Sequence, residues 1–230
     1  MGEKYENIVA EFKSFINDKD YPCVAARAAM SRAHVPCFVA DHIESDEQDE
    51  RILQFIYDFI AHFRNANGSL YSAAVIFRHP ESISEEAYEN FFWERLQRLS
   101  NLDAARHPYD CHVSLDPKDR HFSFSLGEEA FFIIGLYANS PRPSRRFKYP
   151  AIIFNPHVQF DRLRKAGQYK KMKNIVRKRD QHYSGSINPM LRDFGESSEA
   201  MQYTGRQYDA GWTCPLHIRH GSNQDHFSPQ

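Results

Sequence analysis

The spacing of apolar residues along the chain predicts five helices. In most of these segments apolar residues recur every three or four positions, which places them on one face of a helix. The segment 168–182 shows this spacing only thinly, and 156–166 is predicted from Asn155 and Pro156 at its start and Gly167 at its end. The clearest stripe consists of Ile52, Phe55, Ile56, Phe59, Ile60 and Phe63. The predicted helices cover residues 5–18, 48–64, 84–99, 156–166 and 168–182.

Four shorter apolar runs, rich in β-branched and aromatic residues, predict strands. They cover residues 71–77, 122–126, 130–137 and 149–154. Gly127-Glu-Glu129 separates two of them and is typical of a hairpin, which joins antiparallel strands. We therefore expect an α+β fold, with a mainly antiparallel sheet surrounded by helices in a single domain.

The composition fits one domain. The 230 residues are 41% hydrophobic, and no glycine-, serine- or proline-rich linker divides them. We expect the domain to cover residues 1–216, followed by a flexible C-terminal tail over 217–230, where periodicity is lost. The four cysteines form no CxxC pair, and neither a signal peptide nor a membrane-spanning run is recognisable. These features predict a cytoplasmic protein with reduced thiols and no contact with a membrane.

The charge is unevenly distributed. The formal net charge is -1, but residues 142–180 contain 13 Lys/Arg and 2 Asp/Glu, a local charge of +11. Such a band favours an anionic partner, whereas a solvated helix face paired with acidic neighbours is the structural alternative. Because the overall charge is near zero and no DNA or RNA motif is present, we expect no nucleic acid partner.

His157 is the first candidate for chemistry. It follows the strand predicted at 149–154, with Asn155 as a helix cap and Pro156 at the first helical position. The positive end of a helix disfavours imidazolium, so a neutral imidazole is expected, suited to bind a metal or act as a base. A structural hydrogen bond to a neighbouring loop is the alternative. His79 also lies at a strand end and is a second candidate.

Several segments together resemble the YqcI/YcgG family. The similarity covers about residues 10–216 and rests on Tyr21-Pro-Cys-Val-Ala-Ala-Arg-Ala-Ala29, Phe122-Ser-Phe-Ser-Leu126, Ser144-Arg-Arg146, Phe154-Asn-Pro-His-Val-Gln-Phe160, Ser186-Ile-Asn-Pro-Met-Leu191, Ser198-Glu-Ala-Met-Gln-Tyr-Thr-Gly-Arg206 and Trp212-Thr-Cys-Pro215. The family includes heme-dependent N-oxygenases of the guanitoxin and cycloserine pathways, which hydroxylate the guanidine group of arginine or related amino acids. Tyr137 and Ser100 stand where the family has histidines, so the substrate can differ from arginine.

The resemblance implies a site for heme b. Such a site needs an axial ligand, cations for two propionates and an apolar slot. We expect His157 to be the metal ligand, with the thiolate of Cys214 and then His79 as alternatives. Arg145 and Arg146 are expected to contact the propionates. The aromatic walls of the slot are expected to be Phe122, Phe124, Phe131, Phe132 and Phe154.

The same resemblance implies catalytic residues. A guanidinium substrate calls for a carboxylate, and Glu199, or its neighbour Glu196, is the candidate by motif. Arg206 is expected to hold a substrate carboxylate, and Tyr203 of the same segment completes the catalytic set. A structural ion pair between Glu199 and Arg206 is the alternative.

The expected function is therefore that of a heme-dependent oxygenase that hydroxylates an amino or guanidino nitrogen of a small, arginine-like substrate. Its electrons would come from an external electron donor or peroxide, because no flavin or nicotinamide fingerprint is present. The alternative is a non-catalytic heme-binding or heme-sensing protein. A homodimer is the assembly considered.

Overall fold

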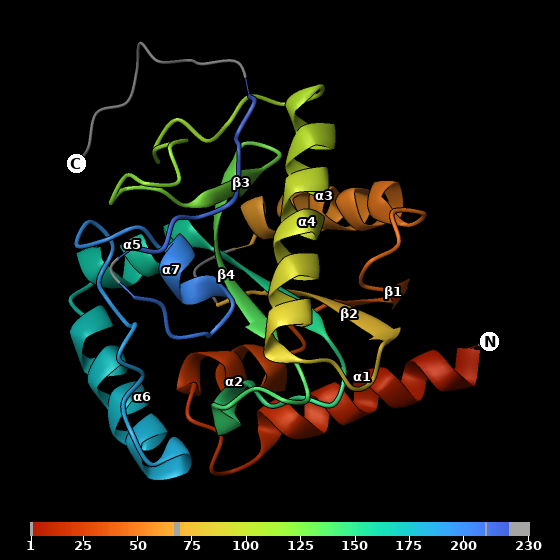
Figure 1. The fold of residues 1–230 in the computed structure, drawn as a ribbon. Coiled ribbons are helices and arrows are strands. Elements are labelled where there is room, and N and C mark those ends of the chain that lie inside the picture. The colour runs from red at the N-terminus through yellow and green to blue at the C-terminus, as the bar shows by residue number, and fades with distance from the viewer. Residues whose placement is uncertain (1, 67–69, 210, 221–230) are drawn as a thin grey trace.

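The computed structural model describes residues 2–66, 70–209 and 211–220. Its five strands form one sheet in the order β1-β2-β5-β4-β3 (Figure 1). Only β1 and β2 are parallel, and every other neighbouring pair is antiparallel. This confirms the α+β fold with a mainly antiparallel sheet. The strands are β1 (Cys37–His42), β2 (Ala73–His79), β3 (Phe124–Leu126), β4 (Glu129–Leu136) and β5 (Ala151–Pro156).

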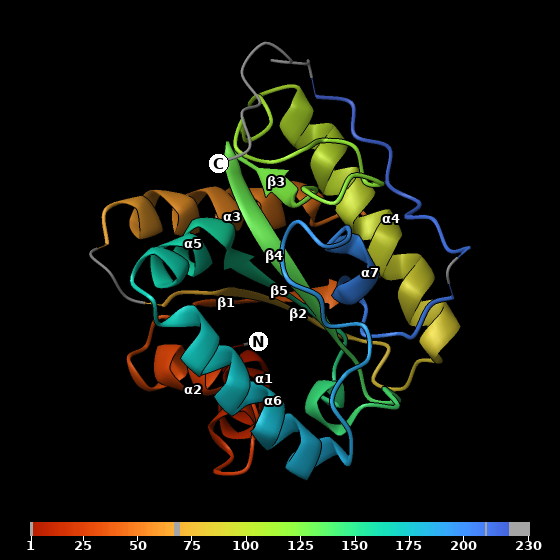
Figure 2. The same cartoon turned by 90° about the vertical axis from the view of Figure 1, so that its left-hand side faces the viewer.

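Helices cover both faces of the sheet. Figure 2 shows α3 on one side of the sheet and α1 and α2 on the other, with α6 beside α2. The described α-helices are α1 (Gly2–Asn17), α2 (Val24–Ser31), α3 (Asp49–Arg64), α4 (Glu85–Ala104), α5 (His157–Lys165), α6 (Tyr169–Ser184) and α7 (Ala200–Tyr203), and a 3₁₀ turn, η1, spans Pro143–Arg145. Among them, none combines the length and the apolar composition that crossing a bilayer requires.

The alternation of side chains along each strand creates two apolar cores. Val75 and Phe154 point into the larger core, which α3 and α4 cover. Ile76 and Ile153, one position along their strands, point into the smaller core under α1 and α2. Since successive residues of a strand face opposite sides, each strand contributes to both cores.

The predicted helices and strands are confirmed in type, and four further elements, β1, α2, η1 and α7, escaped prediction. β1 is a six-residue edge strand with one buried residue, Ala40, so its sequence has no clear alternation. α2 has only eight residues and begins at Cys23, which is not among the residues that mark helix starts. The predicted helix ends at residue 99, whereas α4 continues to Ala104. Its last turn buries the polar residues Ser100 and Asp103, so the spacing of apolar residues does not reveal this end.

The hairpin between β3 and β4 is confirmed and has a two-residue turn. Gly127 and Glu128 have φ of 56° and 60°, and Leu126 pairs with Glu129. Two consecutive positive φ values define the turn geometry that matches the twist of the flanking strands. The backbone N–H of Gly127 also donates to Asp103 Oδ1 at 2.9 Å, which ties the turn to α4.

Residues 217–220 fall within the segment expected to be a tail, yet they pack against α4. His220 is 5% exposed, and its Nε2 lies 2.9 Å from Asp103 Oδ2. Asp103 also accepts a hydrogen bond from the Tyr57 hydroxyl at 2.6 Å. The end of the described chain thus satisfies a buried carboxylate. Residues 221–230, the rest of the expected tail, lie outside the described residues.

We therefore expect His220→Ala to lower the free energy of unfolding by about 1–3 kcal/mol, since it leaves one oxygen of a buried carboxylate without a partner. His217→Ala is the matched control: that side chain is exposed, so the change should stay within about 0.5 kcal/mol. Urea denaturation of both variants measures the difference. Equal stabilities would mean that His220 contributes nothing to the fold.

Candidate functional site

A cavity of about 260 Å³ lies in the smaller core, on the α1 and α2 face of the sheet. Phe132, Ile134 and Ile153 form its floor on β4 and β5. One side wall comes from α1 and α2, and another from residues 188–202. The walls are therefore mainly apolar, and they join segments from the two ends of the chain.

Helix α6 forms the remaining wall through a single stripe. The residues of this stripe recur three and four positions apart along the helix, some as adjacent pairs, so they share one helix face. They are Tyr169, Met172, Lys173, Val176, Arg177 and Asp180. Of the sixteen residues of α6, only Asp180 is buried. The apolar members of the stripe thus face a space that described side chains do not fill.

Six cations line the cavity, and four of them show how different their environments are. Arg142 pairs with Asp180, and Lys173 lies 2.5 Å from Asp193. Arg145 has no carboxylate partner, and burial lowers the pKa of its guanidinium. Arg177 has no hydrogen-bond or ion-pair partner among the described residues, and its Nε is buried. The cavity therefore has positive charge that no described carboxylate neutralises.

The bonds of Arg145 are to backbone carbonyls. Its guanidinium donates to Gly135 O at 3.2 Å, Tyr203 O at 2.7 Å and Gln202 O at 2.9 Å. These bonds join η1 to β4 and to the end of α7. Arg146, the adjacent cation, is exposed and donates to Ser140 O and Pro141 O, away from the cavity. The structure brings Arg145 to the cavity and leaves Arg146 outside.

His157 and Glu199 meet beside the cavity, as their shared assignment to one site predicts. His157 Nε2 lies 3.5 Å from Glu199 Oε1, and His157 Nδ1 lies 3.3 Å from Asp161 Oδ2. Glu199 Oε2 also accepts a hydrogen bond from the Ser123 hydroxyl at 2.8 Å. Glu199 lines the cavity, whereas the ring of His157 lies behind it, against Phe194, with ring centroids 4.3 Å apart.

The surroundings of His157 favour the charged imidazole over the neutral one that the sequence predicts. Burial alone would lower the pKa of His157, but hydrogen bonds and charge from Asp161 and Glu199 outweigh burial and raise this pKa to about 9. The two carboxylates act at close range, whereas the helix terminus supplies only a partial charge. His157 is consequently an imidazolium at neutral pH.

The other members of the expected catalytic set lie outside the cavity lining. Tyr203 is fully buried, and its hydroxyl accepts from Phe124 N and donates to Phe131 O. Arg206 pairs with Glu89 of α4, so the alternative ion pair with Glu199 does not form. Both residues hold the segment after Glu199 in place.

The remaining candidate ligands are also absent from the cavity lining. Phe154 faces the opposite core, with Phe122, Phe124 and Phe131, so only Phe132 of the expected aromatic wall reaches the cavity. Cys214 is half-buried against the larger core, and burial raises the pKa of its thiol to about 12. His79 stacks on His42 beside the parallel strand pair, with ring centroids 6.0 Å apart.

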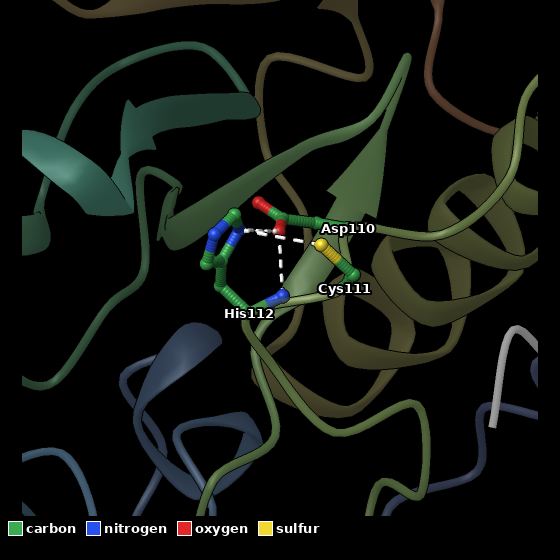
Figure 3. Close-up of side chains that lie close together, drawn as sticks. All are labelled: Asp110, Cys111 and His112. Atoms are coloured by element: carbon green, nitrogen blue, oxygen red, sulfur yellow. Dashed lines mark hydrogen bonds and ion pairs between the residues drawn. The ribbon is translucent and has the colours of Figure 1, made fainter. Parts of the chain in front are cut away.

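Figure 3 shows one cluster of candidate metal ligands at the surface, formed by Asp110, Cys111 and His112. Their ligand atoms lie within 4.8 Å of one another. The carboxylate of Asp110 already accepts hydrogen bonds from the backbone N–H groups of His112 and Ala130. This cluster is therefore explained by turn formation, and we assign no metal to it.

Several residues of the cavity wall were not assigned to the site from the sequence. Tyr21, Cys23, Arg177 and Asn188 are among them. A signal existed for Cys23, because it directly precedes the alanine-rich run that forms α2 and takes the N-cap position. Asn188 and Tyr21 lie in irregular segments, for which periodicity makes no prediction.

The raised pKa of His157 predicts a pH dependence of stability. Its folded-state value, about 9, exceeds the ordinary 6.5, so the stabilisation is complete below about pH 6.5 and is lost as the pH rises through 9. In His157→Gln this loss should be absent between these pH values. His182→Gln, at an exposed histidine of α6, should retain it. Unfolding of the protein without added ligand, measured across this range, would contradict the assignment if wild type and His157→Gln behaved alike.

Comparison with known proteins identifies relatives along most of the chain. The YqcI/YcgG family profile matches residues 12–217. Two proteins of Bacillus subtilis (strain 168), both described as uncharacterized, are similar. YcgG is 28% identical over 80% of this chain and 75% of its own length. YqcI is 30% identical over 79% of this chain and 74% of its own length. No solved structure matches the chain. This chain belongs to the YqcI/YcgG family.

Proposed function

We propose that the cavity binds heme b and that the protein is a heme-dependent oxygenase that hydroxylates an amino or guanidino nitrogen of a small, arginine-like substrate. The proposal rests on the resemblance to the N-oxygenases of the family and on the chemistry of the cavity walls. A flat apolar ligand with two carboxylates needs apolar walls and cations that other groups do not neutralise.

The main support for the proposal is the wall that α6 forms, because its apolar residues face the cavity and only Asp180 of this helix is buried. Met172 and Val176 face the cavity. Arg177, directly after Val176, lines it with a guanidinium that has no hydrogen-bond or ion-pair partner among the described residues. A ligand with an apolar body and an anionic group would bury the first two and pair with the third. The cavity volume of about 260 Å³ is close to the lower end of small-molecule sites, about 300 Å³. Since α6 has a single buried residue, it is the wall that can move outward around a larger ligand.

Bound heme would supply oxygen activation, with electrons from an external donor or peroxide. The residues of the chain would bind and orient the substrate. At the cavity edge the imidazolium of His157 stands between two carboxylates, those of Asp161 and Glu199, so this group of three has a net charge of -1. A guanidinium or ammonium placed beside Glu199 would neutralise the remaining negative charge and would donate hydrogen bonds to the Glu199 carboxylate.

The substrate's position follows from Glu199. Its Oε2 accepts a hydrogen bond from the Ser123 hydroxyl at 2.8 Å. The Ser123 hydroxyl oxygen also lies 3.1 Å from Phe131 O on β4, but its one hydrogen serves a single acceptor at a time. Because both neighbours of Glu199 are held by the sheet and by α5, the carboxylate points in one direction without reorganisation when a substrate enters. Tyr203 and Arg206 would act as positioning residues for this segment, since their side chains bond to β3, β4 and α4.

We expect the protein purified from heme-supplied cells to contain about one heme b per chain, measured as the pyridine hemochrome. Arg177→Glu should weaken heme retention about tenfold or more, because it opposes a propionate with a like charge. Lys178→Glu is the matched control, since Lys178 is exposed on α6 outside the cavity lining. Heme-free wild-type protein would overturn the proposal, and equal retention in both variants would refute the role of Arg177.

We also expect arginine-like substrates to stimulate oxygen or peroxide consumption. Glu199→Gln should raise KM about tenfold or more without changing heme content, because it removes the charge that balances the substrate cation. Glu196→Gln should be close to wild type, since Glu196 is exposed and its Oε2 accepts a hydrogen bond from Asp193 N. If wild-type protein binds heme yet converts no amine, amino acid or guanidine with any electron source, the heme-sensing alternative replaces the enzyme.

A further inference from the structure

Cys23 places a thiol on the wall of the same cavity. It is the N-cap residue of α2, with extended backbone angles (φ -79°, ψ 95°), and its Sγ accepts a hydrogen bond from Ala26 N at 3.4 Å. The sulfur therefore lies at the positive end of an eight-residue helix. Helix N-termini and backbone N–H donors favour the anionic form of sulfur.

Burial and the helix N-terminus act on the Cys23 thiol in opposite directions. Burial raises the pKa of Cys23, while the backbone N–H groups of Ala26 and Ala25 lower it. The burial effect is the larger of the two, so the side chain stays protonated by itself. A bound metal ion reverses this balance, because coordination deprotonates a thiol and replaces the lost hydration with a metal–sulfur bond.

Polar groups around the same cavity independently indicate a ligand. The hydroxyl of Tyr21, which is 6% exposed, has no hydrogen-bond partner among the described residues. Nor does the amide NH₂ of Asn188, which is 7% exposed, within the same part of the chain. Both residues line the cavity, where a ligand could pair with these polar groups. Together with Arg177, they form a set of donors whose acceptors are missing from the described chain.

The other sulfur and imidazole candidates lie elsewhere. No histidine of the described residues lines the cavity, and Cys23 is the only cysteine of that part of the chain that does. His157 is separated from the cavity by Glu199, and Cys214 packs against the opposite core. Cys37 contributes to the smaller core but bonds through its thiol to Val35 O, outside the cavity lining.

We propose that Cys23 Sγ is the protein ligand of the heme iron, and this rests on the proposed function. When the iron–sulfur bond forms, the thiol proton leaves to solvent and the oxidation state of the iron is unchanged. A thiolate ligand donates electron density that favours cleavage of an O–O bond, which suits an oxygenase. The N–H of Ala26 would then donate to the coordinated sulfur and tune its electron donation.

The test is the absorption spectrum of the ferrous carbon monoxide complex, together with the electron paramagnetic resonance spectrum of the ferric protein. We expect wild-type holoprotein to give the long-wavelength Soret band of a thiolate-ligated heme and a thiolate-type ferric signal. Cys23→Ser should lose both, and Cys23→His should give an imidazole-type spectrum. Cys37→Ser and Cys214→Ser, at cysteines outside the cavity lining, should keep the wild-type spectra.

The possible outcomes distinguish the assignment of Cys23 as the iron ligand from the proposal that the protein binds heme. An imidazole-type spectrum in wild-type protein that changes in His157→Ala overturns Cys23 and leaves heme binding intact. A wild-type spectrum retained in Cys23→Ser also overturns it. Wild-type protein that binds no heme refutes both proposals. The wild-type spectra need no variant, so they decide the ligand type even where Cys23→Ser fails to fold.

Discussion

The guanidinium of Arg145 holds the site together, because it is a buried charge whose hydrogen bonds all go to backbone carbonyls. Those carbonyls belong to β4 and to the end of α7, so Arg145 holds the segment that includes Glu199 at a fixed position relative to the sheet. Gly205 packs directly on this side chain: a Cβ there would lie 3.1 Å from Arg145 Cδ, and its φ of +85° suits only glycine. Carbonyl dipoles solvate the cation without neutralising it, so the wall of the cavity stays positive.

Features that depend on one continuous segment could be predicted from the sequence. The stripe of α3 and the hairpin around Gly127 are such features, and both are confirmed. Which face of the sheet holds the cavity depends on where distant helices pack, and no local pattern contains that information. The sequence therefore assigned Phe132 and Phe154 to the same aromatic wall, although they point to opposite cores. Cys23 was not assigned to the site for the same reason, since its wall of the cavity is completed by α6.

The candidate residues illustrate how tertiary contacts override local electrostatics. The helix terminus at His157 argued for a neutral ring, but Asp161 of the same helix, together with Glu199 from a distant segment, raises the pKa of His157. The basic band likewise separates into two populations. Arg142 and Lys173 pair with carboxylates, as the alternative of a neutralised surface predicted, whereas Arg145 and Arg177 do not. The sequence identifies the excess of charge, and only the fold reveals which cations are available to a ligand.

The two cores also differ in the order in which the ribosome supplies their parts. Helix α1 packs through Phe12 on Phe147, with ring centroids 5.4 Å apart, and Tyr21 packs on Tyr183 at 6.3 Å. The apolar side chains of the first residues synthesised thus stay uncovered until α6, much later in the chain, has been synthesised. At about 5–20 residues per second this interval lasts on the order of ten seconds or more. The strands that form the floor of the cavity, β4 and β5, also precede α6 along the chain, so the floor stays uncovered until α6 emerges. A prosthetic group can then be enclosed as α6 packs, without passing through a finished wall.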